Sequence, residues 1–289
     1  MYARVVAATA AAVLGTAAVL LSPASHARAG EGGLPTVIAH RGASAYAPEN
    51  TLAAVDKAAE LGFPWVENDV QRTKDGELVV LHDDSLQRTT DVEDVFPGRA
   101  PWKVKDFTAA EIARLDAGSW FSPAYAGAHV PTLKQYMRRV ERNHQKLLLE
   151  IKNPELYPGI EQQTLKQLGN EGWLDHRHLR RLIVQSFSAD SVRAVHELKP
   201  AVTTAYLGTP PVADLPRLAH FTDLVNPSYG DLSVSYVSAV HAFRGPHRRL
   251  GLFTWTVNDA ATARRVAGYG IDGIITNKPD VVRAALESD

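Results

Sequence analysis

The sequence predicts an α/β fold, a (β/α)8 barrel with an insertion after its second strand. Short apolar, β-branched segments alternate with segments that can form amphipathic helices, and each kind occurs eight times. This alternation is typical of parallel strands, because two parallel strands need a crossover connection between them. About 260 residues follow the N-terminal apolar segment, which is the usual length of such a TIM barrel.

The elements follow one another in regular order along the chain. The expected strands are residues 36–40, 64–70, 147–152, 181–186, 203–207, 224–227, 252–257 and 271–276. The expected helices lie near residues 50–61, 132–144, 159–171, 188–198, 211–220, 233–244, 259–269 and 279–287. The strands at 203–207 and 224–227 carry the weakest signals, and an open doubly wound sheet is the alternative architecture.

The N-terminal segment, residues 1–29, differs from the rest of the chain. One Arg precedes an Ala/Val/Leu stretch over residues 5–21, and small residues then allow cleavage after Ala27 or Ala29. This pattern predicts a secretory signal peptide, and hence a secreted, extracellular chain of residues 30–289 with no stable membrane anchor. An uncleaved anchor is the alternative, since the stretch approaches the length of a bilayer span.

Charge and composition exclude several classes of function. Lys and Arg number 31 against 32 Asp and Glu, so no basic excess indicates nucleic acid, and no polybasic run would hold an anionic membrane. The chain has no Cys, which excludes disulfides, thiolate metal sites and a Cys nucleophile. No feature implies a protein partner.

One apolar segment, residues 77–83, does not fit the eight-fold alternation. It follows the second strand too closely for a parallel crossover, and an Asp-Gly pair between them is a hairpin signal. Residues 70–83 are therefore predicted to form a hairpin on the barrel rim, which brings His82 back toward Asp69. The insertion at 84–131, with a short helix expected within 108–118, would form a lid or a pocket wall.

Polar residues gather where active sites of such barrels lie, at the C-terminal ends of the strands. Those expected there are His40, Arg41, Glu67, Asp69, His82, Asp83, Glu150, Lys152, Gln185, Trp255, Asn258 and Asn277. A single such residue could be structural or face the helix layer. Their convergence on one face of one architecture favours a catalytic site.

Three of these residues are carboxylates that can share one small volume. Glu67 and Asp69 are two apart on a strand and so point to the same side, and Glu150 lies on the neighbouring strand. Buried anions repel one another, and Arg41 and Lys152 can offset only part of that charge. An all-oxygen set of this kind suits Mg²⁺ or Ca²⁺.

The chemistry that fits this set of residues is phosphodiester cleavage. A cation and the basic side chains would stabilise charge on the phosphate oxygens. His40 and His82 could serve as general base and general acid near neutral pH. A glycosidase, which needs two carboxylates and no metal, explains the His and Lys/Arg residues less well.

The chain carries a series of short motifs: His40-Arg41-Gly42, Pro48-Glu49-Asn50-Thr51, Glu67-x-Asp69-Val70, Thr73-x-Asp75-Gly76, His82-Asp83, Arg88-Thr89-Thr90, Leu115-Asp116-Ala117-Gly118, Pro131-Thr132-Leu133, Glu150-Ile151-Lys152, Trp255-Thr256-Val257-Asn258 and Asp272-Gly273-Ile274-Ile275-Thr276-Asn277. In order and spacing, these motifs resemble those of the glycerophosphodiester phosphodiesterases, and they extend over essentially the whole chain that follows the predicted signal peptide.

The resemblance implies hydrolysis of glycerophosphodiesters such as glycerophosphocholine. His40 and His82 would be the acid/base pair, and Arg41 and Lys152 would contact the phosphate. A glycerol hydroxyl would attack the phosphorus, and water would open the resulting cyclic phosphate.

The resemblance also implies one divalent cation, held by Glu67, Asp69 and Glu150. The sequence does not choose between Ca²⁺ and Mg²⁺, although an extracellular location slightly favours Ca²⁺. Asn68 departs from the family, which usually has an apolar or small residue there, and it should face the helix layer. Two roles stay open for Glu49. It could orient Arg41 or His40, or it could simply lie near the start of a helix, where a negative charge is favourable.

Two alternatives to this function stay open. Some relatives act on lysophospholipids as lysophospholipases D, and Trp255 could hold a choline head group by a cation–π contact. Aromatic residues of the insertion could line an acyl channel or simply pack: Phe96, Trp102, Trp120, Phe121 and Tyr125. A non-catalytic barrel that binds a phosphate ligand is the second alternative.

Overall fold

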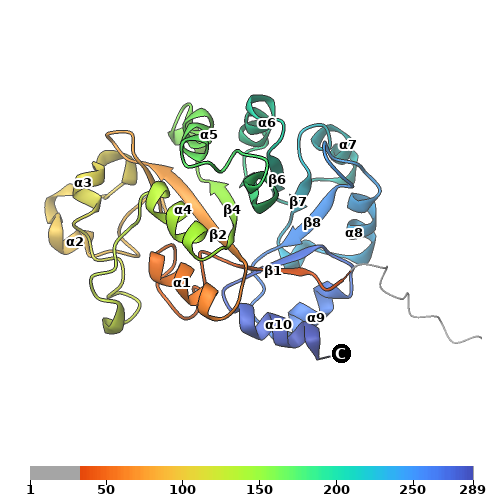
Figure 1. Ribbon diagram of the computed structural model, residues 1–289, viewed down its shortest axis with the longest axis horizontal. Coiled ribbons are helices and arrows are strands. Elements are labelled where there is room, and N and C mark those ends of the chain that lie inside the picture. Colours follow the sequence, from red (N-terminus) through yellow and green to blue (C-terminus); the bar gives the residue numbers. More distant parts are fainter. Residues whose placement is uncertain (1–32, 289) are drawn as a thin grey trace, which may run out of the picture. The chain divides into compact units, whose positions relative to one another are not determined.

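The computed structural model describes residues 33–288, and the predicted signal peptide lies outside these residues. Its sheet has eight parallel strands and one antiparallel strand (Figure 1). The strands are β1 (Thr36–Ala39), β2 (Trp65–Arg72), β3 (Leu78–Val80), β4 (Lys146–Ile151), β5 (Leu182–Ser186), β6 (Thr203–Leu207), β7 (Leu224–Asn226), β8 (Gly251–Thr254) and β9 (Gly273–Thr276).

The eight parallel strands close into a barrel. Their order is β1-β9-β8-β7-β6-β5-β4-β2, and β1 also pairs with β2, where Ala39 lies opposite Val66. The predicted (β/α)8 barrel is therefore confirmed, and the open doubly wound sheet is wrong. The strands expected at 203–207 and 224–227 are present as β6 and β7.

Helices follow the strands around the barrel, as Figure 1 shows. They are α1 (Leu52–Glu60), α4 (Leu133–Arg142), α5 (Ile160–Asn170), α6 (Ala189–Leu198), α7 (Leu215–Leu218), α8 (Val234–His241), α9 (Ala260–Ala267) and α10 (Pro279–Glu287). Thr51 and Thr132 cap α1 and α4 by accepting a hydrogen bond from a backbone N–H of the first turn. The helix expected at 211–220 is shorter than predicted, since a 3₁₀ turn (Val212–Asp214) occupies its first part.

The predicted hairpin is present next to the second barrel strand. β3 pairs antiparallel with β2, and Val80 lies opposite Val70. Gly76 has φ +88° in the turn, a conformation that glycine adopts at little cost. The hairpin carries the chain back toward the end of β2 at which Asp69 lies, since the backbone N–H of Leu81 donates to the Asp69 carbonyl at 3.0 Å.

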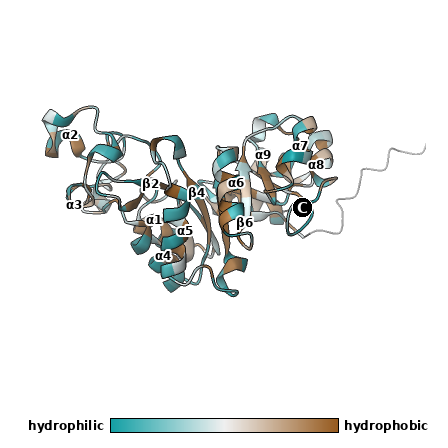
Figure 2. Ribbon diagram, turned by 90° about the horizontal axis from the view of Figure 1, so that it is seen from above, coloured by the Kyte–Doolittle hydropathy of each residue, from teal (hydrophilic) through white to brown (hydrophobic). Residues whose placement is uncertain are grey.

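The insertion contains two short helices, α2 (Val92–Val95) and α3 (Ala109–Ile112), on the side of the barrel away from α7 and α8 (Figures 1 and 2). The helix expected within 108–118 covers only its first part. Asp116 ends that segment, because its carboxylate accepts backbone hydrogen bonds from Gly118, Ser119 and Gly127 at 2.7–2.8 Å. The helix is shorter than expected, and the bond from Gly127 that holds Asp116 is a tertiary contact, which local sequence does not indicate.

Apolar side chains fill the interior of the barrel, and Figure 2 shows hydrophobic strands among helices of mixed polarity. The interior cluster consists of Ile38, Leu148, Ile183, Ala205, Leu224, Phe253 and Ile275. Leu148 also fixes the direction of Glu150, because residues two apart on a strand share one face. Polar side chains therefore lie above this cluster, at the C-terminal end. Within residues 33–288, no helix is long and apolar enough to cross a bilayer.

Candidate active site

Three carboxylates meet inside the C-terminal mouth of the barrel. Glu67 and Asp69 lie on β2 and Glu150 on β4, and Asp69 stands opposite Glu150 in the strand register. One oxygen from each residue lies within 4.8 Å of the other two, and all three side chains are buried. The predicted inward orientation of the carboxylates is thus what the structure has.

The carboxylates differ in charge state because their neighbours differ. Burial and the charge of Asp69 raise the pKa of Glu150 to about 7, and burial with the same neighbour raises the pKa of Glu67 well above its usual range. Burial also disfavours the charged form of Asp69, but Arg41 and Lys152 outweigh it and hold the pKa of Asp69 below its usual range.

The residues present fit a divalent cation. Oδ1 of Asp69 is buried and has no hydrogen-bond partner among the described residues, so it is free to ligate. Three buried carboxylates repel one another unless positive charge lies between them, and all their donor atoms are oxygen. Such a donor set is typical of Mg²⁺ and Ca²⁺ sites.

Two basic side chains, Lys152 and Arg41, flank the carboxylates. Nζ of Lys152 lies 2.8 Å from Oε1 of Glu150 and 3.8 Å from Oδ1 of Asp69. Arg41 has φ +55°, and its backbone N–H donates to Oε2 of Glu67 at 2.9 Å. Its guanidinium Nη1 donates to Oε1 of Glu49 at 2.8 Å, so Glu49 orients Arg41 rather than His40.

His40 follows β1 directly and faces the carboxylates. Its Nδ1 lies 2.6 Å from Oδ1 of Asn277, and its Nε2 lies 4.0 Å from Oε2 of Glu67. Burial and the nearby Arg41 lower the pKa of His40 to about 4. The imidazole is therefore neutral at pH 7 and able to accept a proton.

His82 reaches the same cavity from the hairpin. Its Nδ1 donates to Oδ1 of Asp83 at 2.6 Å, and this bond, with Arg88 beside it, holds the pKa of the Asp83 carboxyl well below its usual range. The two histidines thus have different partners: His40 a neutral amide, and His82 a carboxylate. His82 and Asp83 reach this place because the predicted hairpin turns the chain back toward the end of β2.

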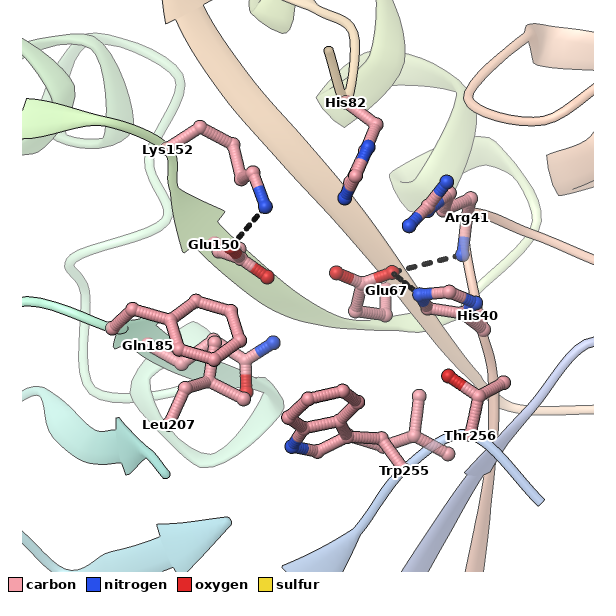
Figure 3. Close-up of a pocket in the computed structure, with 12 residues that line it drawn as sticks. His40, Arg41, Glu67, His82, Glu150, Lys152, Gln185, Leu207, Trp255 and Thr256 are labelled. Carbon is pink, nitrogen blue, oxygen red and sulfur yellow. Dashed lines mark hydrogen bonds and ion pairs between the residues drawn. The ribbon is translucent and has the colours of Figure 1, made fainter. Parts of the chain in front are cut away.

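The cavity between these groups is small, about 100 Å³ (Figure 3). Its lining is His40, Arg41, Glu67, His82, Glu150, Lys152, Gln185, Phe187, Leu207, Trp255, Thr256 and Ile275. One half is charged and the other is apolar. In the apolar half, Trp255 stands edge-on to Phe187, with ring centroids 5.5 Å apart.

The aromatic residues of the insertion do not line this cavity. Phe96 packs edge-on against Phe107 at 5.3 Å between centroids, and Phe121 lies between Trp120 and Tyr125 at 5.7 Å from each. They pack within the insertion, which was one of the two expected roles; lining an acyl channel was the other.

Several residues outside the cavity hold the site residues in place, and the sequence did not indicate this role for them. Asn50, which directly precedes the α1 cap Thr51, donates through Nδ2 to Oδ2 of Asp69 at 2.8 Å. Gln71, on β2, donates through Nε2 to the carbonyl of His82 at 3.1 Å, and Tyr157 donates to Oε1 of Gln71 at 2.8 Å. Only the position of Gln71, two residues beyond Asp69 on one strand face, hinted at such a role.

Comparisons with known proteins find relatives of one family. A model of the "Glycerophosphoryl diester phosphodiesterase family" matches residues 40–281. A glycerophosphodiester phosphodiesterase of Bacillus subtilis (strain 168) is 34% identical over 291 residues, with 93% of each chain covered. A glycerophosphodiester phosphodiesterase of Caldanaerobacter subterraneus is 35% identical over 249 residues, covering 85% of this chain and 95% of the relative.

A solved structure extends the comparison to three dimensions. The Oleispira antarctica phosphodiesterase in complex with the product sn-glycerol-3-phosphate superposes with a TM-score of 0.78 and 30% sequence identity. The match covers 88% of this chain and 97% of the Oleispira chain.

Proposed function

Since the chain belongs to the glycerophosphoryl diester phosphodiesterase family and so is a phosphoric diester hydrolase, we propose a metal-dependent reaction with two catalytic histidines. The substrate is a glycerophosphodiester such as glycerophosphocholine, and the products are glycerol phosphate and an alcohol. The observation that carries this proposal is the meeting of two histidines, two basic side chains and the carboxylates of Glu67 and Glu150 in one small cavity, with the Asp69 carboxylate beside them.

The protein's own residues divide the work. Arg41 and Lys152 hold the phosphate at the charged half of the cavity, where their positive charge offsets the charge that builds on its oxygens. His40, neutral because of its low pKa, is suited to take a proton from the attacking glycerol hydroxyl. His82, held by the Asp83 carboxylate, is suited to give a proton to the departing alcohol. Water then opens the resulting cyclic phosphate and gives glycerol phosphate.

A divalent cation, Ca²⁺ or Mg²⁺, belongs to this proposal, with Glu67, Asp69 and Glu150 as its ligands. When bound, the cation withdraws electron density from phosphate oxygens and neutralises the carboxylates. An extracellular location, which the N-terminal segment predicts, slightly favours Ca²⁺.

The apolar half of the cavity supports a secondary proposal about the leaving group. Trp255 and Phe187 offer aromatic surface next to the charged half, which suits a choline head group. A lysophospholipid could place its acyl chain on the same surface, since 49% of Phe187 is exposed. The small volume of the cavity favours the unacylated substrate.

A substrate panel with metal reconstitution tests the proposal. Purified protein is treated with EDTA and assayed on glycerophosphocholine and on lysophosphatidylcholine, with and without added Ca²⁺ or Mg²⁺. Activity should disappear with chelation and return with the ion, and glycerophosphocholine should be preferred. Full activity in excess EDTA, or a clear preference for the acylated substrate, would contradict this function.

Histidine variants test the catalytic roles. His40→Ala and His82→Ala should each lower kcat at least ~100-fold, in line with the usual contribution of a general acid or base. His220→Ala is the matched control, because His220 is exposed and lies outside the cavity. Unchanged turnover in either test variant would remove that histidine from the mechanism.

Secretion is tested separately, by the N-terminal residue of protein recovered from culture medium, which should follow Ala27 or Ala29.

A further inference from the structure

Arg88 lies in the insertion, outside the cavity, and its guanidinium is shared between two carboxylates. Nε lies 2.6 Å from Oδ2 of Asp83, and Nη2 lies 3.1 Å from Oδ1 of the same residue. Nη1 and Nη2 also donate to the two oxygens of Glu49, at 2.9 and 2.7 Å. The planar guanidinium can fork to both carboxylates at once, which a lysine ammonium cannot do with the same geometry.

Each of these carboxylates has its second partner inside the cavity. Asp83 accepts the Nδ1 hydrogen of His82 at 2.6 Å, and Glu49 accepts from Nη1 of Arg41 at 2.8 Å. A continuous chain of hydrogen bonds therefore runs from His82 through Arg88 to Arg41. Its two ends are the proposed general acid and one of the proposed phosphate-binding groups.

The backbone at His82 is held independently of Arg88. Nε2 of Gln71 donates to the carbonyls of Leu81 and His82 at 3.0 and 3.1 Å, and it also contacts the carbonyl of Asp83. Loss of Arg88 would consequently leave the hairpin backbone in place and free the side chains at both ends of the hydrogen-bond chain, those of His82 and of Arg41.

The charges of Asp83, Glu49 and Arg88 also indicate that Arg88 holds the two carboxylates in place. Asp83 and Glu49 would face each other as two anions if Arg88 were absent. Burial disfavours a charged Glu49, but the Arg88 hydrogen bonds and Arg41 outweigh it and lower the pKa of Glu49. The side chain of Arg88 is 45% exposed, and an ion pair at such a site contributes little to folding stability.

From these contacts we propose that Arg88 is a positioning residue for the phosphodiesterase reaction, which sets the orientation of both His82 and Arg41. The role rests on the proposed function of His82 and Arg41. It gives a function to the arginine of the Arg88-Thr89-Thr90 motif and connects the insertion to the active site.

Arg88→Ala is the first test, measured on glycerophosphocholine with saturating cation. We expect kcat/KM to fall ~100-fold, the usual effect of misplacing a reacting group by about 1 Å. Arg88→Lys should recover part of the loss, since lysine restores the charge without the fork. Arg99→Ala is the control in the same insertion: Arg99 pairs with Glu111, and neither residue lines the cavity.

A double-mutant cycle tests whether Arg88 acts through Asp83. Asp83→Ala should lower mainly kcat, because it frees His82, and Glu49→Ala should raise mainly KM, because it frees Arg41. Arg88→Ala should do both. In the Asp83→Ala background, Arg88→Ala should cause no further loss of kcat, because the effects of residues that act as one unit do not add.

Three results would overturn the positioning role. The first is activity of Arg88→Ala within about two-fold of the parent, and the second is additive losses of kcat in the cycle. The third is an equal loss of activity, with an equal fall in melting temperature, for Arg88→Ala and Arg99→Ala. Unchanged turnover in His82→Ala would instead contradict the proposed function, so the two failures are distinguishable.

Discussion

Nδ1 of His40 lies 2.6 Å from Oδ1 of Asn277, at the point where the first and last strands of the barrel meet. The same oxygen accepts a hydrogen bond from Oγ of Ser44 at 2.9 Å, and the backbone N–H of Asn277 donates to Oδ1 of Asn258 at 2.9 Å. As an acceptor, the amide oxygen fixes a hydrogen on Nδ1 and leaves the lone pair of Nε2 to face the cavity.

Replacing Asn277 should therefore disturb catalysis more than folding. Asn277→Ala removes the acceptor, and we expect kcat to fall ~10–100-fold, a usual effect of losing a residue that orients a functional group. Asn277→Asp keeps the acceptor but adds a negative charge, which should raise the pKa of His40 from about 4. Because His40 must be neutral to accept a proton, the acidic limb of the pH–rate profile should move to higher pH. Steady-state kinetics against pH measure both effects, with exposed Asn170→Ala as the control.

Metal removal should destabilise the protein in a way that depends on pH. Without the cation, Glu150 has a folded-state pKa of about 7, above its ordinary value of 4.5. The free energy of unfolding therefore falls as the pH rises through the window between these two pKa values. A cation binds the deprotonated carboxylates, so its stabilising effect grows over the same window. The melting temperature with Ca²⁺ minus that with EDTA should accordingly increase from about pH 5 to about pH 8. A constant or shrinking difference would argue against these ligands.

Two glycines separate the effects of backbone conformation and of crowding. Gly42 and Gly76 both have positive φ, at +79° and +88°. A Cβ on Gly42 would lie 2.5 Å from the carbonyl carbon of Ala54, whereas a Cβ on Gly76 would meet nothing within 4 Å. Gly76→Ala should cost about 1–2 kcal/mol of unfolding free energy with activity kept. Gly42→Ala should cost more and also lower activity, since Arg41 is its neighbour; urea unfolding and the substrate assay distinguish them.

Asn68 should limit stability rather than support it. It is buried on β2, facing away from Glu67 and Asp69, and neither amide atom has a hydrogen-bond partner among the described residues. Asn68→Leu, of similar size, should raise the free energy of unfolding by about 1–3 kcal/mol.

Asn226→Leu is the matched control for this substitution. Asn226 is equally buried, but its Nδ2 donates to Oε1 of Gln185 at 3.0 Å and its Oδ1 accepts from the backbone of Phe253 at 3.2 Å. This variant should therefore be less stable than the parent. Chemical denaturation of both proteins gives the comparison, and a destabilised Asn68→Leu would show that its amide is satisfied in solution.

The barrel and the cluster of three carboxylates could be predicted because local patterns determine both. Strands alternating with helices imply parallel pairing, and the two-residue spacing of Glu67 and Asp69 fixes a shared face whatever the surroundings. The hairpin followed from a short connection containing Asp75-Gly76, and it alone brought His82 to the mouth.

The supporting contacts could not be predicted because they join residues that no local pattern links. Arg88 meets Glu49 across 39 positions, and His40 meets Asn277 across 237. The end of β8 was missed for a similar reason: Trp255 leaves the barrel strand and its indole N–H donates to the carbonyl of Asn226 at 2.8 Å. Such pairings depend on the assembled barrel rather than on propensity.

The register of β2 against β4 places Asp69 opposite Glu150. A slip of one residue between these strands would turn every side chain of one of them to the opposite face, and the carboxylates would part. A misassembled barrel would then have no competent ion site, even if its strands were otherwise intact. The number of cations bound per protein molecule would thus measure the fraction of correctly assembled barrels in a refolded preparation, if the proposed ion site is occupied.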